Sequence, residues 1–246
     1  MKKALIVFLF FGISAGSIAQ NYIRFLDKYG YEVGESSNSG FSFFELIQSQ
    51  ERMVLLHRFS KDSLKISEKS FLFDSLGNEL ASSEKEFYAS KKTKSVIRKD
   101  KLAEEVLSKQ FYETGILKSE ILSKKDSVVY EKYFSIDGLE IPKPELTPAS
   151  PKGGVKGWNN YLASELRYPS EARASGAEGM IVLEFDLDSE GVIKNLKVVN
   201  QGENHKSLEL EAIRVLEKYP YRWVPALENG VPVETRIKLP LKFKLS

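Results

Sequence analysis

Two segments of the last hundred residues alternate apolar and polar positions and predict β-strands. In residues 180–187 the apolar side chains occupy every second position, and Glu184 and Asp186 share the opposite face. Residues 237–245 alternate in the same way, with basic side chains on the polar face. A period of two is typical of a half-buried strand. We therefore expect both segments in a sheet with one apolar face, the first joined by a turn at Gly191 to a partner strand at residues 192–199.

Three other segments place apolar residues at helical spacing. The first predicted helix spans residues 158–166 and ends before Pro169, which disfavours a helical conformation in the residue preceding it. A short second helix is expected to begin at Ser170. The third spans residues 205–218 with Asn204 as its cap. Its buried face is predicted to comprise Leu208, Ala212, Val215, Leu216 and Tyr219.

Residues 20–141 lack a long helical pattern and contain many short segments with strand character. Residues 73–77, 111–115 and 134–138 each place an aromatic residue four positions before a glycine, a pattern that suits a strand ending in a tight hairpin. The last two copies lie 23 residues apart and resemble MORN-type hairpin repeats. An antiparallel sheet with ordinary hairpins is the alternative. Both interpretations predict an antiparallel, β-rich N-terminal domain.

The clearest domain boundary is the segment 142–154, which holds four of the nine prolines. Such a composition predicts an extended linker rather than packed structure, with a reach of roughly 40 Å in the polyproline conformation. The linker would separate the N-terminal domain, residues 20–141, from a C-terminal domain, residues 155–246.

The first 19 residues have the pattern of a secretory signal peptide. Lys2 and Lys3 precede an apolar run at residues 4–13, and the small residues Ser17 and Ala19 follow it. An uncleaved membrane anchor is the alternative, but an anchor needs about 20 apolar residues to cross a bilayer. We therefore expect export into the periplasm and cleavage after Ala19.

Composition excludes several classes of function. The chain contains no cysteine, so it has neither disulfides nor a lipid-anchoring thiol nor a zinc–thiolate site. The formal net charge is +2, and it becomes zero once Lys2 and Lys3 are removed. A neutral chain has no electrostatic footprint for nucleic acid, so we expect no nucleic-acid partner.

No catalytic or metal-binding constellation is evident. His57 and His205 lie far apart in the sequence, and no nucleophile elbow, phosphate loop or paired-histidine motif is present. Residues 186–191 copy the first half of a calcium loop, but the twelfth position is Lys197 rather than a bidentate glutamate. A hairpin turn is the preferred interpretation of that segment. The sequence therefore predicts no enzyme, no cofactor and no metal site.

Residues 153–246 resemble the C-terminal domain of TonB-type energy transducers. The match begins with Tyr168 and Pro169, and it includes a Trp-x-Phe-x-Pro-Ala signature that is altered here to residues 221–226 with Trp223 retained. The matching motif residues are Tyr168, Pro169, Ala172, Gly176, Gly179, Phe185, Gly191, Leu208, Ala212, Trp223, Pro225, Ala226, Gly230, Pro232 and Phe243.

The resemblance implies an α+β fold for the whole chain, in which the β-rich domain precedes two helices on a three-stranded antiparallel sheet. It also implies a partner, since this family captures an extended segment of an outer-membrane TonB-dependent transporter at a sheet edge. Pro240 predicts that the last strand is such an edge. The candidate partner-binding residues are Arg236, Lys238, Pro240, Lys242 and Lys244, although a solvated basic face is the alternative.

Two functions follow from the resemblance. The first is a periplasmic protein that couples energy to outer-membrane transporters, with inner-membrane motor proteins as further partners if the N-terminus is an uncleaved anchor. The second is a soluble periplasmic scaffold that transmits no energy. A transducer needs a membrane anchor and a long spacer, so the cleavable N-terminus and the short linker favour the scaffold.

N-terminal sequencing of the protein from soluble and membrane fractions tests the signal peptide. We expect the chain to begin at Gln20, because the residues before it have the small-x-small pattern of a cleavage site. Recovery from the soluble fraction with that start favours the scaffold. An intact Met1 in the membrane fraction would contradict cleavage and favour an anchored transducer.

Overall fold

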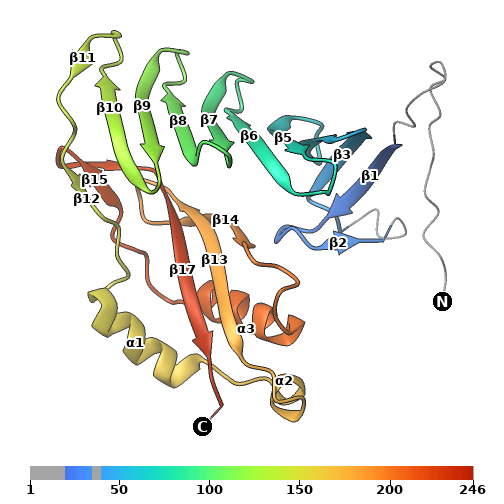
Figure 1. Ribbon diagram of the computed structural model, residues 1–246. Coiled ribbons are helices and arrows are strands. Elements are labelled where there is room, and N and C mark those ends of the chain that lie inside the picture. The colour runs from blue at the N-terminus through green and yellow to red at the C-terminus, as the bar shows by residue number, and fades with distance from the viewer. Residues whose placement is uncertain (1–19, 35–39, 246) are drawn as a thin grey trace. The chain divides into compact units, whose positions relative to one another are not determined.

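The computed structural model describes residues 20–34 and 40–245 (Figure 1). These residues form two compact units, one with residues 20–27 and 31–143 and the other with residues 28–30 and 144–245. We call them the N-terminal and the C-terminal unit. The predicted signal peptide, residues 1–19, lies outside the described residues. No helix within the described ranges is long and apolar enough to cross a bilayer.

The N-terminal unit is one antiparallel sheet of 11 strands in the order β11-β10-β9-β8-β7-β6-β5-β4-β3-β1-β2. From β3 onward each strand pairs with its successor in the chain, so the topology is a meander, which confirms the predicted β-rich region. The strands are β1 (Gln20–Leu26), β2 (Glu32–Val33), β3 (Phe43–Gln50), β4 (Met53–Ser60), β5 (Lys65–Phe73), β6 (Glu79–Phe87), β7 (Thr93–Asp100), β8 (Glu105–Phe111), β9 (Leu117–Lys124), β10 (Ser127–Phe134) and β11 (Glu140–Ile141).

Hairpins of one design recur at one end of this sheet. After Phe87, Phe111 and Phe134, the next residue donates its backbone N–H to the carbonyl four positions on, at 2.8–2.9 Å. The left-handed position is taken by Lys91 (φ 66°) in the first hairpin and by glycine in the other two. The glycine pattern does not reveal the copy at Phe87, nor the one after Phe59, where Ser60 donates its N–H to the Leu64 carbonyl at 2.9 Å and Ser63 is left-handed (φ 62°). The predicted copy at residues 73–77 forms the β5–β6 turn, at the opposite end of the strands.

Tyrosine hydroxyls connect successive hairpins. Tyr88 donates its hydroxyl hydrogen to the carbonyl of Phe111 at 2.7 Å, and Tyr112 donates to the carbonyl of Phe134 at 2.9 Å. The two bonds span 23 and 22 residues, one residue less than the spacing between successive hairpins. The hairpin array is therefore joined by side chains as well as by the strand ladder. The likeness to MORN repeats stays a prediction.

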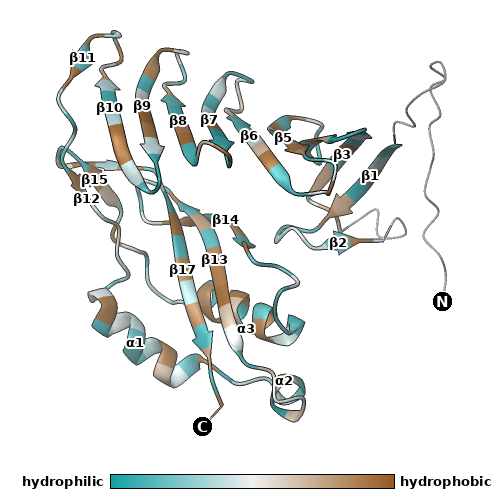
Figure 2. Ribbon diagram, viewed as in Figure 1, coloured by the Kyte–Doolittle hydropathy of each residue, from teal (hydrophilic) through white to brown (hydrophobic). Residues whose placement is uncertain are grey.

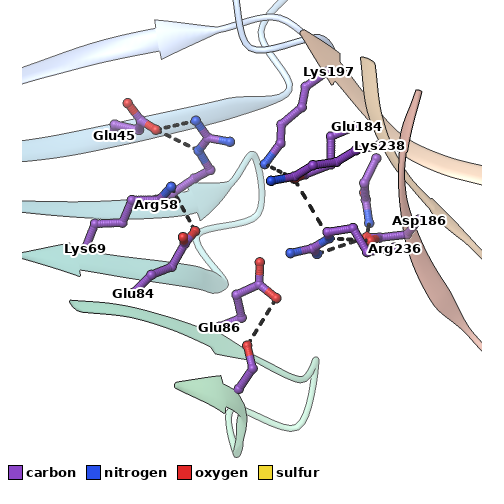
Figure 3. Close-up of polar contacts among 12 residues, drawn as sticks. Glu45, Arg58, Lys69, Glu84, Glu86, Glu184, Asp186, Lys197, Arg236 and Lys238 are labelled. Atoms are coloured by element: carbon purple, nitrogen blue, oxygen red, sulfur yellow. Dashed lines mark hydrogen bonds and ion pairs between the residues drawn. The ribbon is translucent and has the colours of Figure 1, made fainter. Parts of the chain in front are cut away.

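The apolar core of the N-terminal sheet is small, so polar contacts between its strands contribute to its stability. Leu26 and Ile47 are the buried apolar residues among those described in this unit. Glu45 is only 1% exposed, and its carboxylate binds Arg24 at 2.6 Å and Arg58 at 2.5 Å. Figure 3 shows Glu45 beside Arg58. A buried carboxylate held by two guanidinium groups fixes the pairing of β1, β3 and β4.

The C-terminal unit contains three helices and two three-stranded sheets. Its sheets have the orders β14-β13-β17 and β12-β15-β16. The fold class is α+β, as predicted, and the five-residue α2 is the short helix expected to begin at Ser170. The elements are β12 (Leu146–Thr147), α1 (Gly154–Glu165), α2 (Ser170–Ala174), β13 (Gly179–Leu187), β14 (Ile193–Val198), α3 (Lys206–Glu217), β15 (Ala226–Glu228), β16 (Val231–Val233) and β17 (Thr235–Phe243).

The apolar face of β13 and one face of α3 form the core of this unit. The buried residues of the two elements include the positions that the periodicity predicted. They are Ile181, Leu183, Phe185 and Leu187 from β13, and Leu208, Ala212, Ile213, Val215 and Leu216 from α3. Burying a side chain of this size stabilises the fold by about 1.5–3 kcal/mol. Figure 2 shows the apolar and polar residues alternating along β17, the partner of β13.

Aromatic rings attach α1 to this core. The ring of Trp158 in α1 lies 6.0 Å from that of Trp223, which in turn meets Phe185 edge-on at 5.3 Å. Tyr219 contacts Trp158 at 5.3 Å, and Tyr161 donates its hydroxyl hydrogen to the carbonyl of Val215 at 2.8 Å. The altered tryptophan signature thus places Trp223 between the helix and the sheet.

The cap of α3 differs from the predicted one. His205, rather than Asn204, is the N-cap, and its Nδ1 accepts the N–H of Ser207 at 3.3 Å. Asn204 instead donates its amide to the carbonyl of Met180 at 3.3 Å. Both residue types can accept a hydrogen bond, so the choice depends on the position of β13, which the local sequence does not reveal.

The segment predicted as a free linker is bonded to the C-terminal unit. β12 pairs with β15, and Ser150 exchanges two backbone hydrogen bonds with Val224 at 2.8 and 3.0 Å. Asn229 holds Glu145 from both sides: its backbone N–H donates to the Glu145 carbonyl, and its Oδ1 accepts the Glu145 N–H, each at 2.8 Å. The partners of this segment lie some 75 to 85 residues further along the chain, so its sequence alone does not reveal them.

Replacing Gly191 by alanine tests the packing at the β13–β14 turn. Gly191 has φ 80°, and an added Cβ would lie 2.0 Å from the carbonyl oxygen of Trp223. The matched control is Gly176→Ala, with φ 66° and no atom within 4 Å of the added Cβ. A left-handed alanine costs roughly 1–2 kcal/mol at either position. We expect Gly191→Ala to lose at least about 2 kcal/mol more in urea unfolding, and equal losses would contradict this close approach.

Candidate partner-binding edge

The last strand, β17, lies at an edge of its sheet. It pairs along its whole length with β13, from Thr235 opposite Leu187 to Phe243 opposite Gly179, without a register shift. Within the residues that the structure describes, no strand pairs with the other side of β17. The prediction that this strand is an edge is confirmed for those residues.

The hydrogen bonds of Val182 show which backbone groups of β17 face outward. The N–H of Val182 donates to Asn200 Oδ1 at 2.9 Å, and its carbonyl accepts from the Val199 N–H at 2.8 Å. Both groups therefore point away from β17. Val182 lies opposite Pro240, so this pair is not hydrogen-bonded and the backbone of Pro240 faces the free edge. Because this direction alternates along a strand, the backbones of Arg236, Lys238 and Lys242 also face outward.

Pro240 interrupts the free edge near its middle. Proline has no N–H, so its position in the outward series removes one hydrogen-bond donor without weakening the ladder to β13. The open donors that remain belong to Lys238 on one side of Pro240 and to Lys242 on the other.

Half of the predicted basic row is paired within its own sheet. Arg236 binds Asp186 at 2.8 Å, and Glu184 lies 2.8 Å from Lys197 and 3.8 Å from Lys238. Figure 3 shows these contacts across β14, β13 and β17. Asp186 and Glu184 are 6% and 8% exposed, since the longer basic side chains cover them. Arg236 and Lys238 are nevertheless exposed, at 39% and 65% of their side chains, so the solvated basic face stays open as the alternative. The register that brings them close to carboxylates was not visible in the sequence.

Lys242 and Lys244 differ from the other members of the row. Both are exposed, and Lys242 lies opposite the uncharged Met180. No carboxylate of the described part of the chain lies within ion-pair distance of either ammonium group. The uncompensated positive charge of β17 is therefore concentrated at its C-terminal end.

The motif residues build the unit that holds this edge. The ring of Tyr168 meets Phe243 edge-on at 6.0 Å, and its hydroxyl donates to the Ala177 carbonyl at 2.5 Å. Ala172 is completely buried, and a Cβ on Gly179 would come within 2.0 Å of Asn204 Oδ1. The other motif residues cap α2 (Pro169), follow it (Gly176), lie in the core (Phe185, Leu208, Ala212, Trp223) or belong to the turns and strands around it (Gly191, Pro225, Ala226, Gly230, Pro232).

The segment that resembles half a calcium loop is a hairpin turn. Asp188 accepts the backbone N–H groups of Glu190 and Val192, each at 2.9 Å. Asp186 binds Arg236 and the amide of Asn195, both at 2.8 Å. Both carboxylates therefore have structural partners. Among the described residues no cluster of histidine, aspartate and glutamate has the arrangement of a metal site.

The C-terminal part of the chain is similar to known proteins. Residues 164–245 match the family model described as "Gram-negative bacterial TonB protein C-terminal". A curated relative named "Protein TonB", from Vibrio cholerae serotype O1 (strain ATCC 39315 / El Tor Inaba N16961), is 35% identical over 80 residues. The match covers 32% of this chain and 31% of the relative, so the chain spans about a third of the relative's length.

The pKa of Asp188 makes the hairpin turn sensitive to acid. The Val192 N–H, and after it Lys194, lowers the pKa of this carboxyl to about 2. A carboxyl with a depressed folded-state pKa stabilises the fold above its unfolded pKa, near 3.9, and loses this contribution as the pH falls toward 2. We expect Asp188→Asn to lower the unfolding free energy at pH 6 but to have little effect near pH 2. An equal loss at both pH values in urea titrations would contradict this role.

Proposed function

We propose that this unit binds outer-membrane TonB-dependent transporters in the periplasm, because residues 164–245 match the family model of the TonB C-terminal domain. An extended segment of the transporter adds to the free edge of β17, and the complex takes part in the energy coupling of transport. The observation that carries the proposal is the row of outward-facing backbone groups at Lys238, Pro240 and Lys242. Backbone hydrogen bonds of this kind provide affinity in strand addition, and side chains select the partner.

Pro240 limits the length of the added ladder. An antiparallel segment receives a hydrogen bond from Lys238, meets no donor at Pro240, and receives another from Lys242. A partner that fits this edge is therefore short or bends opposite Pro240. The same interruption protects the edge against indiscriminate pairing with other strands.

The charge distribution favours an acidic residue in the partner near the C-terminal end of β17. Lys242 and Lys244 supply the uncompensated charge there, whereas Arg236 and Lys238 are already close to Asp186 and Glu184. Rim charges of this kind act mainly on the association rate and on the choice of partner.

A second candidate is a periplasmic scaffold that docks at the same edge without transmitting energy. It is favoured by the bonding of residues 145–150 to β15 and its neighbours, because a bonded segment does not serve as a free spacer. The N-terminal sequencing described above separates this candidate from a membrane-anchored transducer.

Replacing Lys238 by proline tests strand addition at this edge. The variant loses an outward N–H, whereas the control Lys238→Ala loses the same charge and keeps the N–H. Binding of peptides from the plug regions of the same organism's transporters is measured by fluorescence anisotropy. We expect proline to weaken binding about 5- to 10-fold relative to alanine, the effect of one hydrogen bond worth roughly 1 kcal/mol.

Circular dichroism of both variants checks that the fold is retained. Equal affinities for the proline and alanine variants would show that the backbone of β17 is not the docking element. Absence of binding of any plug peptide at millimolar concentration would overturn the proposed function itself.

A further inference from the structure

One face of the N-terminal sheet carries a cluster of basic residues across β6, β7 and β8, which lie side by side (Figure 1). The register places Lys85, Val96 and Lys109 in one row across the three strands. Arg98 lies two residues after Val96 and therefore on the same face. Adjacent strands are about 4.8 Å apart and alternate residues about 6.8 Å apart, so the three basic side chains surround Val96 at distances that let their charged ends converge.

A pocket of about 630 Å³ lies over this cluster. Lys91 and Lys92, from the hairpin between β6 and β7, line it together with Lys85, Arg98 and Lys109. Its described lining contains five basic residues and one carboxylate, that of Glu68. Val96, Leu107 and Phe111 supply an apolar surface in the same pocket.

The positive charge of this pocket is only partly compensated. Glu68 binds Lys65 and lies 3.4 Å from His57, and Lys109 binds Glu120 at 2.6 Å. Across residues 20–34 and 40–245, no carboxylate lies within ion-pair distance of Arg98, whereas Lys85 lies directly opposite Glu68 in the β5–β6 register. Arg98 is exposed and sits between Ser83 and Leu107 in its row, so its guanidinium is available to a ligand.

We propose that this pocket binds an anion that carries two or more phosphate groups. A guanidinium recognises a phosphate with two parallel hydrogen bonds, and the neighbouring ammonium groups add charge-assisted bonds. The volume lies within the range of sites for small organic ligands, and the apolar residues accommodate the organic part of the ligand. The chain without Lys2 and Lys3 has no net charge, so the attraction arises from this local cluster. The inference concerns the N-terminal unit and is independent of strand addition at β17.

Titration of the full chain with tripolyphosphate tests this site by calorimetry at low salt. Arg98→Gln removes the unpaired guanidinium, and Lys99→Gln is the matched control because Lys99 is the exposed neighbour on the opposite face. We expect Arg98→Gln to weaken binding about 10-fold and the control to stay within about 2-fold, since losing a charge-assisted bond costs far more than losing a remote charge. Adding Lys85→Gln to Arg98→Gln should abolish binding.

A sedimentation assay distinguishes the source of the phosphate groups. Vesicles of phosphatidylcholine with cardiolipin, a lipid that carries two phosphate groups, are compared with vesicles of phosphatidylcholine alone. Arg98-dependent binding to the anionic vesicles identifies a lipid headgroup, whereas Arg98-dependent binding of tripolyphosphate alone identifies a soluble ligand. Absence of binding in both assays, or equal losses for the Arg98 and Lys99 variants with folds unchanged by circular dichroism, would overturn the proposal.

Discussion

The pairing of β17 with β13 is the constraint on which the candidate site depends. Nine consecutive residue pairs without a register shift determine which backbone groups of β17 are used internally and which face outward. The same register puts Glu184 and Asp186 opposite Lys238 and Arg236. A shift by one residue would turn the apolar side chains of β17 out of the core. The core contacts of Leu241 and Phe243 therefore maintain the open edge as well as the stability of the sheet.

Much of this arrangement was predictable because it follows from local periodicity. The alternation at residues 180–187 and 237–245 predicted both strands and their buried faces, and Pro240 predicted an edge. The ordered motif from Tyr168 to Phe243 indicated a resemblance to the TonB C-terminal domain, and residues 164–245 match the model of that family. A buried face and an absent donor are properties of single residues and their near neighbours, so one sequence is sufficient to find them.

The remaining features arise from contacts between distant residues. The pairing of Arg236 with Asp186 depends on a register across 50 residues, and Asn229 bonds to Glu145 across 84. His205 replaced Asn204 as the cap of α3 because Asn204 is bound to β13. Lys91 adopts the left-handed conformation that Gly115 and Gly138 adopt in the hairpins after Phe111 and Phe134. The glycine pattern therefore did not reveal the repeat at Phe87. The basic pocket of the N-terminal unit, too, combines residues from strands that are neighbours only once the meander has formed.

The tyrosine bonds at the hairpins have a consequence for how the N-terminal sheet loses its structure. Tyr88 and Tyr112 each couple one hairpin to the next, but the equivalent position in the last hairpin is Ser135. Coupling between nearest neighbours makes an array behave as a one-dimensional chain of units, whose ends open before its middle. The β10–β11 hairpin is the terminal unit, so its amide hydrogens should exchange with solvent first and opening should progress toward β6.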